Sequence, residues 1–150
     1  MKFYTGNIFD SKTKFIAHQV NCMGVMNSGI AKQIRQKYPN VFEEYFNHYM
    51  RGTKELGDCL NVLCPDGRII SNLYGQYSYG YDNKVYTNYE FLREAMRKLA
   101  SIMKPDDSIS FPYKMSCDRG GGNWKIVFEN ISDIFKNFNV EIWRLPKIGE

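Results

Sequence analysis

Two glycine-containing loops carry the residues with the clearest chemical potential. The first, NCMGVMNSGI (21–30), follows the apolar stretch KFIAHQV, and the second, SCDRGGGNW (116–124), lies near the other end of the chain. Glycine lets the backbone approach a phosphate closely and adopt positive φ. The first N–H groups of a helix lack partners and bind anions without a cationic side chain. Two such loops that face each other would hold a diphosphate from both sides.

The spacing within the first loop excludes two common nucleotide sites. GVMNSGIA (24–31) has the glycine spacing of a P-loop, but Ile30 and Ala31 stand where lysine and serine or threonine are required. No GxGxxG follows the first strand, which excludes a dinucleotide-binding Rossmann unit. Either loop alone would be only a tight strand-to-helix turn. Two loops in matching positions favour a phosphate-containing ligand that needs no bound metal.

Four side chains near these loops are candidates for chemistry. His18, at the carboxyl end of a strand, could act as general acid or base, or be a hydrogen-bonded core histidine. Asp118 could activate water or hold a sugar hydroxyl, or pair with Arg119. A carboxylate aimed at a diphosphate would be repelled, so a ligand role requires it to face elsewhere. Cys22 and Cys117 would need a base and a lowered pKa to act as nucleophiles, so packing is expected.

A tyrosine-rich stretch separates the two loops. It contains six tyrosines in the 16 residues of YGQYSYGYDNKVYTNY (74–89). Tyr77, Tyr79 and Tyr81 could form a lid that stacks on a ligand. A surface loop or a contact with another chain explains them equally well. The stretch lacks the interleaved lysine and arginine of a nucleic-acid stacking platform.

The order of elements predicts the scaffold. Strands are expected at 2–5, 14–20, 58–64, 68–74, 108–112 and 140–145, with a hairpin at the turn PDGR. Helices are expected at 30–37, from Pro39 onward, after a capping box formed by Thr87 and Glu90, and from Trp124 to Phe138. Strands that alternate with helices indicate one α/β domain over 1–150, a three-layer α/β/α unit with a mixed, largely parallel sheet. Both glycine loops then lie at the carboxyl edge, where such sheets bind ligands.

Composition narrows the function classes. The chain has 150 residues, 43% of them hydrophobic, with net charge +4, which suits one globular domain with an anionic small ligand. Lysine and arginine are scattered, so nucleic acid is not an expected partner. Four cysteines and two histidines show no zinc spacing. No apolar run approaches membrane-spanning length and no signal peptide is visible, so a cytoplasmic protein with reduced thiols is expected, with no membrane partner and a monomer favoured.

Four segments together resemble a macrodomain, the ADP-ribose-binding fold. They are GNIFD (6–10), IAHQVNCMGVMNSGIAKQIRQKYP (16–39), ISNLYGQ (70–76) and FPYKMSCDRGGGNW (111–124). Their order and spacing agree with the family over almost the whole chain. The chain looks most similar to small single-domain members related to the yeast ADP-ribose-1″-phosphate phosphatase and their phage-encoded relatives. The resemblance implies ADP-ribose or ADP-ribose-1″-phosphate as ligand and no cofactor.

The resemblance also implies a division of the site. Asn21 would contact the distal ribose, and the phosphatase relatives carry a histidine in the motif that matches His18. Asp118 takes no role from the resemblance and joins His18 and Asn21 in the expected catalytic set only as a carboxylate of the second loop. The implied ligand-binding residues are Asn7 and Ile8 at the adenine, Gly24, Val25, Met26, Ser28, Gly29 and Ile30 in the first loop, Leu73 and Gln76 by the distal ribose, Tyr113 beside the pocket, and Ser116, Cys117, Arg119, Gly120 and Gly121 in the second loop.

Four positions depart from the family pattern. Asp118 stands where many members have glycine. Asn7 replaces an acidic residue at the adenine. Gln76 occupies the position of a catalytic lysine in relatives that remove ADP-ribose from glutamate or DNA. Gly120 replaces an aspartate of the glutamate-specific relatives. A lysine-based glycohydrolase mechanism is therefore disfavoured.

The sequence thus supports several hypotheses. The leading one is an enzyme that hydrolyses ADP-ribose-1″-phosphate to ADP-ribose and phosphate. The alternatives are a non-catalytic binder of ADP-ribose or a related nucleotide signal, and a hydrolase that removes ADP-ribose from modified macromolecules. A nucleic-acid-binding domain ranks last.

Overall fold

A computed structural model describes residues 1–80, 82, 84–117 and 120–147. A six-stranded sheet has the order β1-β6-β5-β2-β4-β3. Its strands are β1 (Lys2–Thr5), β2 (Phe15–Val20), β3 (Cys59–Leu63), β4 (Ile69–Tyr74), β5 (Ser108–Pro112) and β6 (Asn139–Arg144). The helices are α1 (Gly29–Lys37), α2 (Pro39–Arg51), α3 (Tyr89–Ile102) and α4 (Trp124–Ile134), with a short 3₁₀ helix, η1 (Ile8–Asp10). β3 pairs antiparallel with β4 and the other neighbouring pairs run parallel, which confirms the mixed, largely parallel α/β sheet.

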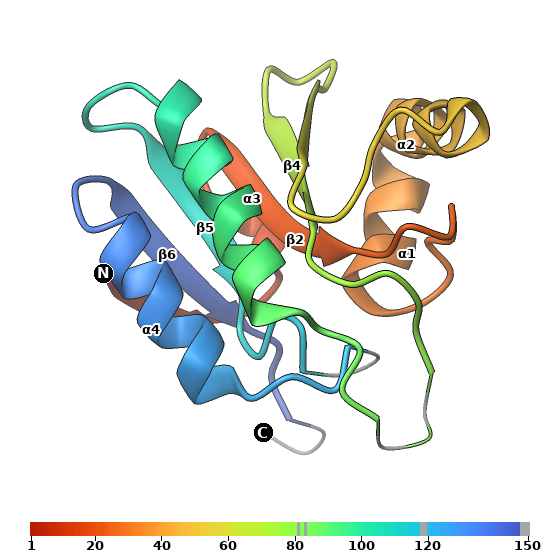
Figure 1. Ribbon diagram of the computed structural model, residues 1–150. Helices are drawn as coiled ribbons and strands as arrows, with labels where there is room; N and C mark the ends of the chain where they lie inside the picture. Colours follow the sequence, from red (N-terminus) through yellow and green to blue (C-terminus); the bar gives the residue numbers. More distant parts are fainter. Residues whose placement is uncertain (81, 83, 118–119, 148–150) are drawn as a thin grey trace.

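Helices cover both faces of the sheet, with α3 and α4 side by side across one face (Figure 1). Strand β2 is buried on both sides because its side chains alternate between two cores. Phe15 and Ala17 belong to the core under α3 and α4, whereas Ile16 and Val20 belong to the core under α1 and α2. A central parallel strand therefore needs a nearly continuous apolar run, which KFIAHQV provides.

One predicted helix start was wrong. Helix α3 begins at Tyr89, and its cap is Asn88, whose Oδ1 accepts a hydrogen bond from the Phe91 N–H at 3.1 Å. Thr87 is buried and donates its hydroxyl to the Ser116 carbonyl at 3.0 Å instead of capping the helix. The capping-box pattern failed because the threonine hydroxyl is used by a tertiary contact. The predicted role of Pro39 is confirmed, since it opens α2.

The sheet order brings the two glycine loops together. β2 pairs directly with β5, in the register Phe15 with Ile109 and Ile16 with Ser110. The first loop follows β2 and the second follows β5, so both lie at the same carboxyl edge. This placement agrees with the sequence-based prediction.

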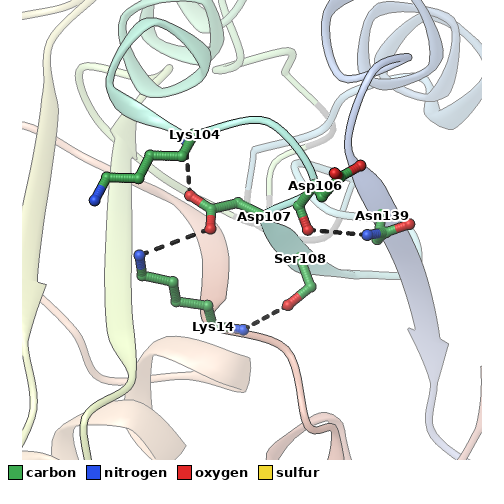
Figure 2. Close-up of polar contacts among 6 residues, drawn as sticks. All are labelled: Lys14, Lys104, Asp106, Asp107, Ser108 and Asn139. Carbon is green, nitrogen blue, oxygen red and sulfur yellow. Dashed lines mark hydrogen bonds and ion pairs between the residues drawn. The ribbon is translucent and has the colours of Figure 1, made fainter.

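The opposite edge of the sheet is held by a polar cluster that joins the starts of β2, β5 and β6 (Figure 2). The Asp107 carboxylate accepts from the Lys104 N–H at 2.8 Å and lies 3.7 Å from the Lys14 ammonium. The Lys14 N–H donates to Ser108 Oγ at 2.9 Å, and Asn139 Nδ2 donates to the Asp106 carbonyl at 3.0 Å. These contacts fix the starts of the three strands. They lie at the end of the sheet away from the glycine loops.

Asp107→Ala is expected to lower the free energy of unfolding by about 1 kcal/mol, because it removes the side-chain acceptor of the Lys104 N–H in the turn before β5. Urea denaturation measures the change. Asp133→Ala, the same substitution at an exposed position of α4, should stay within about 0.5 kcal/mol of the parent. Equal losses in the two variants would contradict the assigned role of Asp107.

Candidate functional site

A cavity of about 460 Å³ lies between the two glycine loops at the carboxyl edge of the sheet. Residues from both loops and from the ends of β2, β5 and β6 form its wall. The site residues expected from the sequence that line it are Ile8, Asn21, Val25, Ser28, Gly29, Ile30, Gln76, Tyr113, Ser116 and Gly120. The fold therefore gathers segments separated by most of the chain into one pocket.

The first turn of α1 forms one side of the cavity. Ser28 occupies the N-cap position, but its side chain makes no capping hydrogen bond. The corresponding asparagines of α3 and α4, Asn88 and Asn123, do cap their helices. Because Gly29 and Ile30 line the cavity, the N–H groups of this turn lie beside it without a side-chain cap. Such a helix end attracts an anion.

The second loop is held in place by a side-chain network around Gln19. Ser116 Oγ donates to Gln19 Oε1 at 2.9 Å, and Gln19 Nε2 donates to Gln76 Oε1 at 2.5 Å and to Thr87 Oγ1 at 3.0 Å. A Cβ added at Gly120 would stand within 2.8 Å of Gln19, Thr87 and Ser116 atoms. Only glycine fits there without displacing the network.

Gln76 is a fixed, neutral part of this wall. It is 7% exposed, accepts from Gln19 and donates through Nε2 to the Ser78 carbonyl at 2.8 Å. Its amide carries no charge and has no proton to exchange near neutral pH. The charged side chains that line the cavity in the described part of the chain are Lys114 and Arg144, and no described aspartate, glutamate or histidine joins them. This charge balance favours an anionic ligand.

His18 is placed away from the cavity, in the core under α1 and α2. It is fully buried, and its Nε2 lies 2.6 Å from Asn72 Oδ1. Since Asn72 Nδ2 donates to the Leu60 carbonyl, we assign the Nε2 proton as the donor to Asn72. Burial lowers the His18 pKa to about 4, against the opposing effect of the Asn72 hydrogen bond. The histidine is therefore neutral at physiological pH, and its surroundings match the hydrogen-bonded core histidine weighed above.

Asn21 organises the first loop. Its Oδ1 accepts from the Met23 N–H at 2.9 Å and from the Tyr45 hydroxyl at 2.8 Å, and its Nδ2 donates to the Val25 carbonyl at 3.0 Å. It also lines the cavity. These bonds give the loop its shape, and that shape places the α1 N-terminus beside the cavity.

Several expected site residues lie elsewhere. Asn7 caps η1 by accepting from the Phe9 N–H at 2.9 Å. Met26 and Leu73 are fully buried in the cores, and Gly121 packs against Lys84. The residues absent from the described cavity wall are Asn7, His18, Gly24, Met26, Leu73, Cys117 and Gly121. Asp118, Arg119 and Tyr81 fall outside the described residues.

The cysteine thiols beside the loops stay protonated at neutral pH. Burial raises the pKa of Cys117 to about 11, and burial with nearby Asp58 and Glu55 raises the pKa of Cys22. Both raised pKa values leave little thiolate at neutral pH and so oppose a nucleophilic role. This agrees with the packing role expected for these residues.

A wall at the end of β6 was not anticipated from the sequence. Trp143 lines the cavity beside Gly6, and its ring stacks on Tyr4 with centroids 4.8 Å apart. A Cβ at Gly6 would lie 3.3 Å from the Trp143 ring, so glycine leaves the indole room. The signal that could have revealed this wall is the pairing of β6 with β5, whose carboxyl end carries the second loop.

Within residues 1–147 and outside the gaps named above, no group of three or more His, Cys, Asp or Glu side chains could hold a metal ion. No helix in that part of the chain is long and apolar enough to cross a membrane.

Comparisons with known proteins agree with this architecture. No family model matches the sequence. A curated relative, the DNA ADP-ribosyl glycohydrolase of Thermus aquaticus, is 22% identical over 150 residues, which cover 95% of this chain and 40% of the relative. This chain thus spans well under half of that protein.

Two solved structures match over nearly the whole chain. The macrodomain of Mycobacterium tuberculosis DarG superposes with a TM-score of 0.80 at 20% identity and covers 95% of this chain and 98% of its own. Thermosipho africanus DarTG in complex with ADP-ribose gives a TM-score of 0.75 at 18% identity over 97% of this chain and 41% of its own. These superpositions show that the chain has the macrodomain fold.

Proposed function

We propose that the cavity binds ADP-ribose, with the diphosphate between the first and second glycine loops. The observation that carries this proposal is the uncapped first turn of α1, which lies on the wall of the same cavity as Gly120 of the second loop. Backbone N–H groups there match phosphate oxygens. Lys114 and Arg144 add positive charge to the same wall.

The shape of the cavity supports an orientation for the nucleotide. Ile8 and Trp143 offer an apolar surface beside Gly6, which suits the adenine ring. The distal ribose then lies near Asn21 and Gln76, at the other end of the wall. A cavity of about 460 Å³ falls within the range of small-molecule sites.

We assign the reaction to hydrolysis of ADP-ribose from a macromolecule, with DNA as the favoured substrate. The curated relative is named a DNA ADP-ribosyl glycohydrolase, and the two solved structures described above are of DarG and of DarTG with ADP-ribose. The likeness expected to phosphatase-type and phage-encoded members finds no support among these relatives. In the proposed reaction water adds to C1″ of the distal ribose, the bond to the DNA acceptor breaks, and the acceptor takes a proton.

Gln76 favours a second candidate, binding without turnover. Its amide is held at both ends by Gln19 and Ser78 and supplies no ammonium group. A domain with these loops and without a general acid or base would retain the nucleotide uncut.

One assay separates these functions. The protein is incubated with an ADP-ribosylated single-stranded oligonucleotide and, in parallel, with ADP-ribose-1″-phosphate, and the products are followed by chromatography. Release of ADP-ribose from the oligonucleotide alone supports the glycohydrolase, and release from the phosphate ester supports the phosphatase. Calorimetric ADP-ribose binding without product supports the binder. Absence of ADP-ribose binding at millimolar concentration would overturn the proposed function.

Ser28→Tyr is expected to weaken ADP-ribose binding by about 30-fold, equivalent to about 2 kcal/mol. The phenol ring would occupy the cavity beside the first turn of α1 and block N–H contacts to phosphate. Isothermal titration measures the affinity. Ser101→Tyr, at an exposed position of α3, is the matched control and should bind like the parent. An unchanged affinity in Ser28→Tyr would place the diphosphate elsewhere.

A further inference from the structure

A second cavity, of about 550 Å³, lies on the other side of the first glycine loop. Its wall comes from α2, the segment before β3, the end of β4 and the start of α3. Asn21 belongs to the walls of both cavities. The two cavities therefore adjoin at Asn21. None of the roles assigned above uses this space.

Aromatic side chains dominate the second cavity. Tyr45 and Tyr74 are buried, with ring centroids 6.0 Å apart. Tyr49, Tyr77 and Phe91 are 44%, 64% and 36% exposed, so their rings are accessible beside the same hollow. Exposed aromatic faces around a cavity suit a planar ring, and stacking on them tolerates any base.

One polar group in this wall lacks a partner. The Tyr74 hydroxyl is buried and has no hydrogen-bond partner among the described residues. The Tyr45 hydroxyl, by contrast, shares its one proton between the main-chain carbonyl oxygen of Asn21 at 2.7 Å and Asn21 Oδ1 at 2.8 Å. Buried hydroxyls are normally paired, so an unpaired one needs an explanation. The hydroxyl oxygen has no exposed surface, so a ring in the cavity reaches it only when a neighbouring side chain turns aside, and a polar atom on the edge of that ring then supplies the missing partner.

The charges of the wall favour an uncharged ligand ring. Lys54 and Glu55 both line the cavity, so their opposite charges leave no net preference for an anion. A nucleobase combines a planar face for stacking, polar edge atoms and no charge. The scattered basic residues of the chain are compatible with recognition of one base, because this mode does not require a long phosphate track.

We propose that the second cavity binds a nucleobase of the DNA strand that carries the ADP-ribose. The inference rests on the proposed function, because it assumes that ADP-ribose fills the first cavity with its distal ribose near Asn21. The base stacks on the rings of Tyr77 and Phe91 and meets the Tyr74 hydroxyl with a polar edge atom. The site selects modified DNA over modified protein.

Two substitutions test the contacts. Tyr77→Ala removes an exposed ring but keeps the backbone carbonyl that accepts from the Cys22 N–H, and Tyr74→Phe removes only the hydroxyl. Phe3→Ala is the matched control, because Phe3 is 63% exposed and lies in β1. Binding to ADP-ribose, to an ADP-ribosylated oligothymidylate and to an ADP-ribosylated peptide is measured for each. Tyr77→Ala should weaken oligonucleotide binding on the order of tenfold and leave the other two affinities unchanged.

The outcomes separate this proposal from the proposed function. If ADP-ribose binds and the modified oligonucleotide binds equally to the parent and Tyr77→Ala, the second site is overturned alone. Equal affinity of the parent for oligonucleotide and peptide also overturns it. An independent arm titrates unmodified oligothymidylate at millimolar concentration and follows side-chain NMR signals. Shifts at Tyr77 and Phe91 support the base site even if ADP-ribose fails to bind, and their absence contradicts it.

Discussion

Gly121→Ala is expected to lower the free energy of unfolding by about 3 kcal/mol and to weaken ADP-ribose binding on the order of 100-fold. Gly121 has φ +63°, and a Cβ there would overlap the Lys84 carbonyl oxygen. That backbone cannot move freely, because the Tyr86 and Thr87 N–H groups both donate to the Gly120 carbonyl at 2.8 Å. The alanine therefore strains the loop and displaces its neighbour. Urea denaturation and calorimetric titration measure the two effects.

Gly52 provides a matched control for this prediction. It has the same φ of +63°, but a Cβ there meets nothing within 4 Å. Gly52→Ala should cost about 1 kcal/mol from the left-handed backbone alone and leave ADP-ribose affinity unchanged. Equal effects in the two variants would show that packing of the second loop against residues 84–85 has no part in binding.

The stability of the protein is expected to fall by about 3 kcal/mol as the pH drops from 6.5 to 4. His18 is buried and neutral in the folded state, with its pKa lowered to about 4 from 6.5. Between these values the unfolded chain binds a proton that the folded chain does not, so the free energy of unfolding decreases as pH falls. The difference of about 2.5 in pKa, at about 1.36 kcal/mol each, gives the stated loss. Above pH 6.5 His18 is neutral in both the folded and the unfolded chain, so its titration no longer changes the free energy of unfolding.

His18→Gln should remove most of this pH dependence, because glutamine does not titrate. Urea denaturation at pH 7.0, 5.5 and 4.5 gives the slope for each variant, whatever the stability of the variant at neutral pH. The lowered pKa values of Asp58 and Asp66 also reduce stability as the pH falls, but their effect is small above pH 4.5, because the unfolded carboxyl groups take up most of their protons nearer the ordinary value of 3.8. His48→Gln is the matched control at the end of α2. A slope that survives in His18→Gln would assign the effect to other groups.

The scaffold could be predicted because its signals are local. The apolar run of β2, the helical periodicity from Trp124 onward and the turn before β4 each specify an element within a few residues. The two loops could be placed because parallel strands bring their carboxyl ends to one edge. Thr87 was misassigned because its hydroxyl has a partner 29 positions away, at Ser116, and no local pattern reveals such a contact.

Which residues line the cavity was harder to predict from the sequence, for the same reason. The position of His18 depends on which face of the sheet its side chain points to. It lies on the same face of β2 as Ile16 and Val20, which pack in the core under α1 and α2. Gln19, one residue later, points to the other face and organises the second loop. Trp143 reaches the cavity only because β6 lies beside β5. Each of these depends on strand order, which the sequence does not state.

The pairing of β2 with β5 has a consequence for the order of folding events. The Gln19–Ser116 hydrogen bond joins residues 97 positions apart, so the cavity exists only after the chain has closed a long loop, which is a slow and entropically costly step. Nucleotide binding therefore stabilises only the state that has completed this step. If the closure comes after the rate-limiting transition state, bound nucleotide retards unfolding and leaves the refolding rate nearly unchanged.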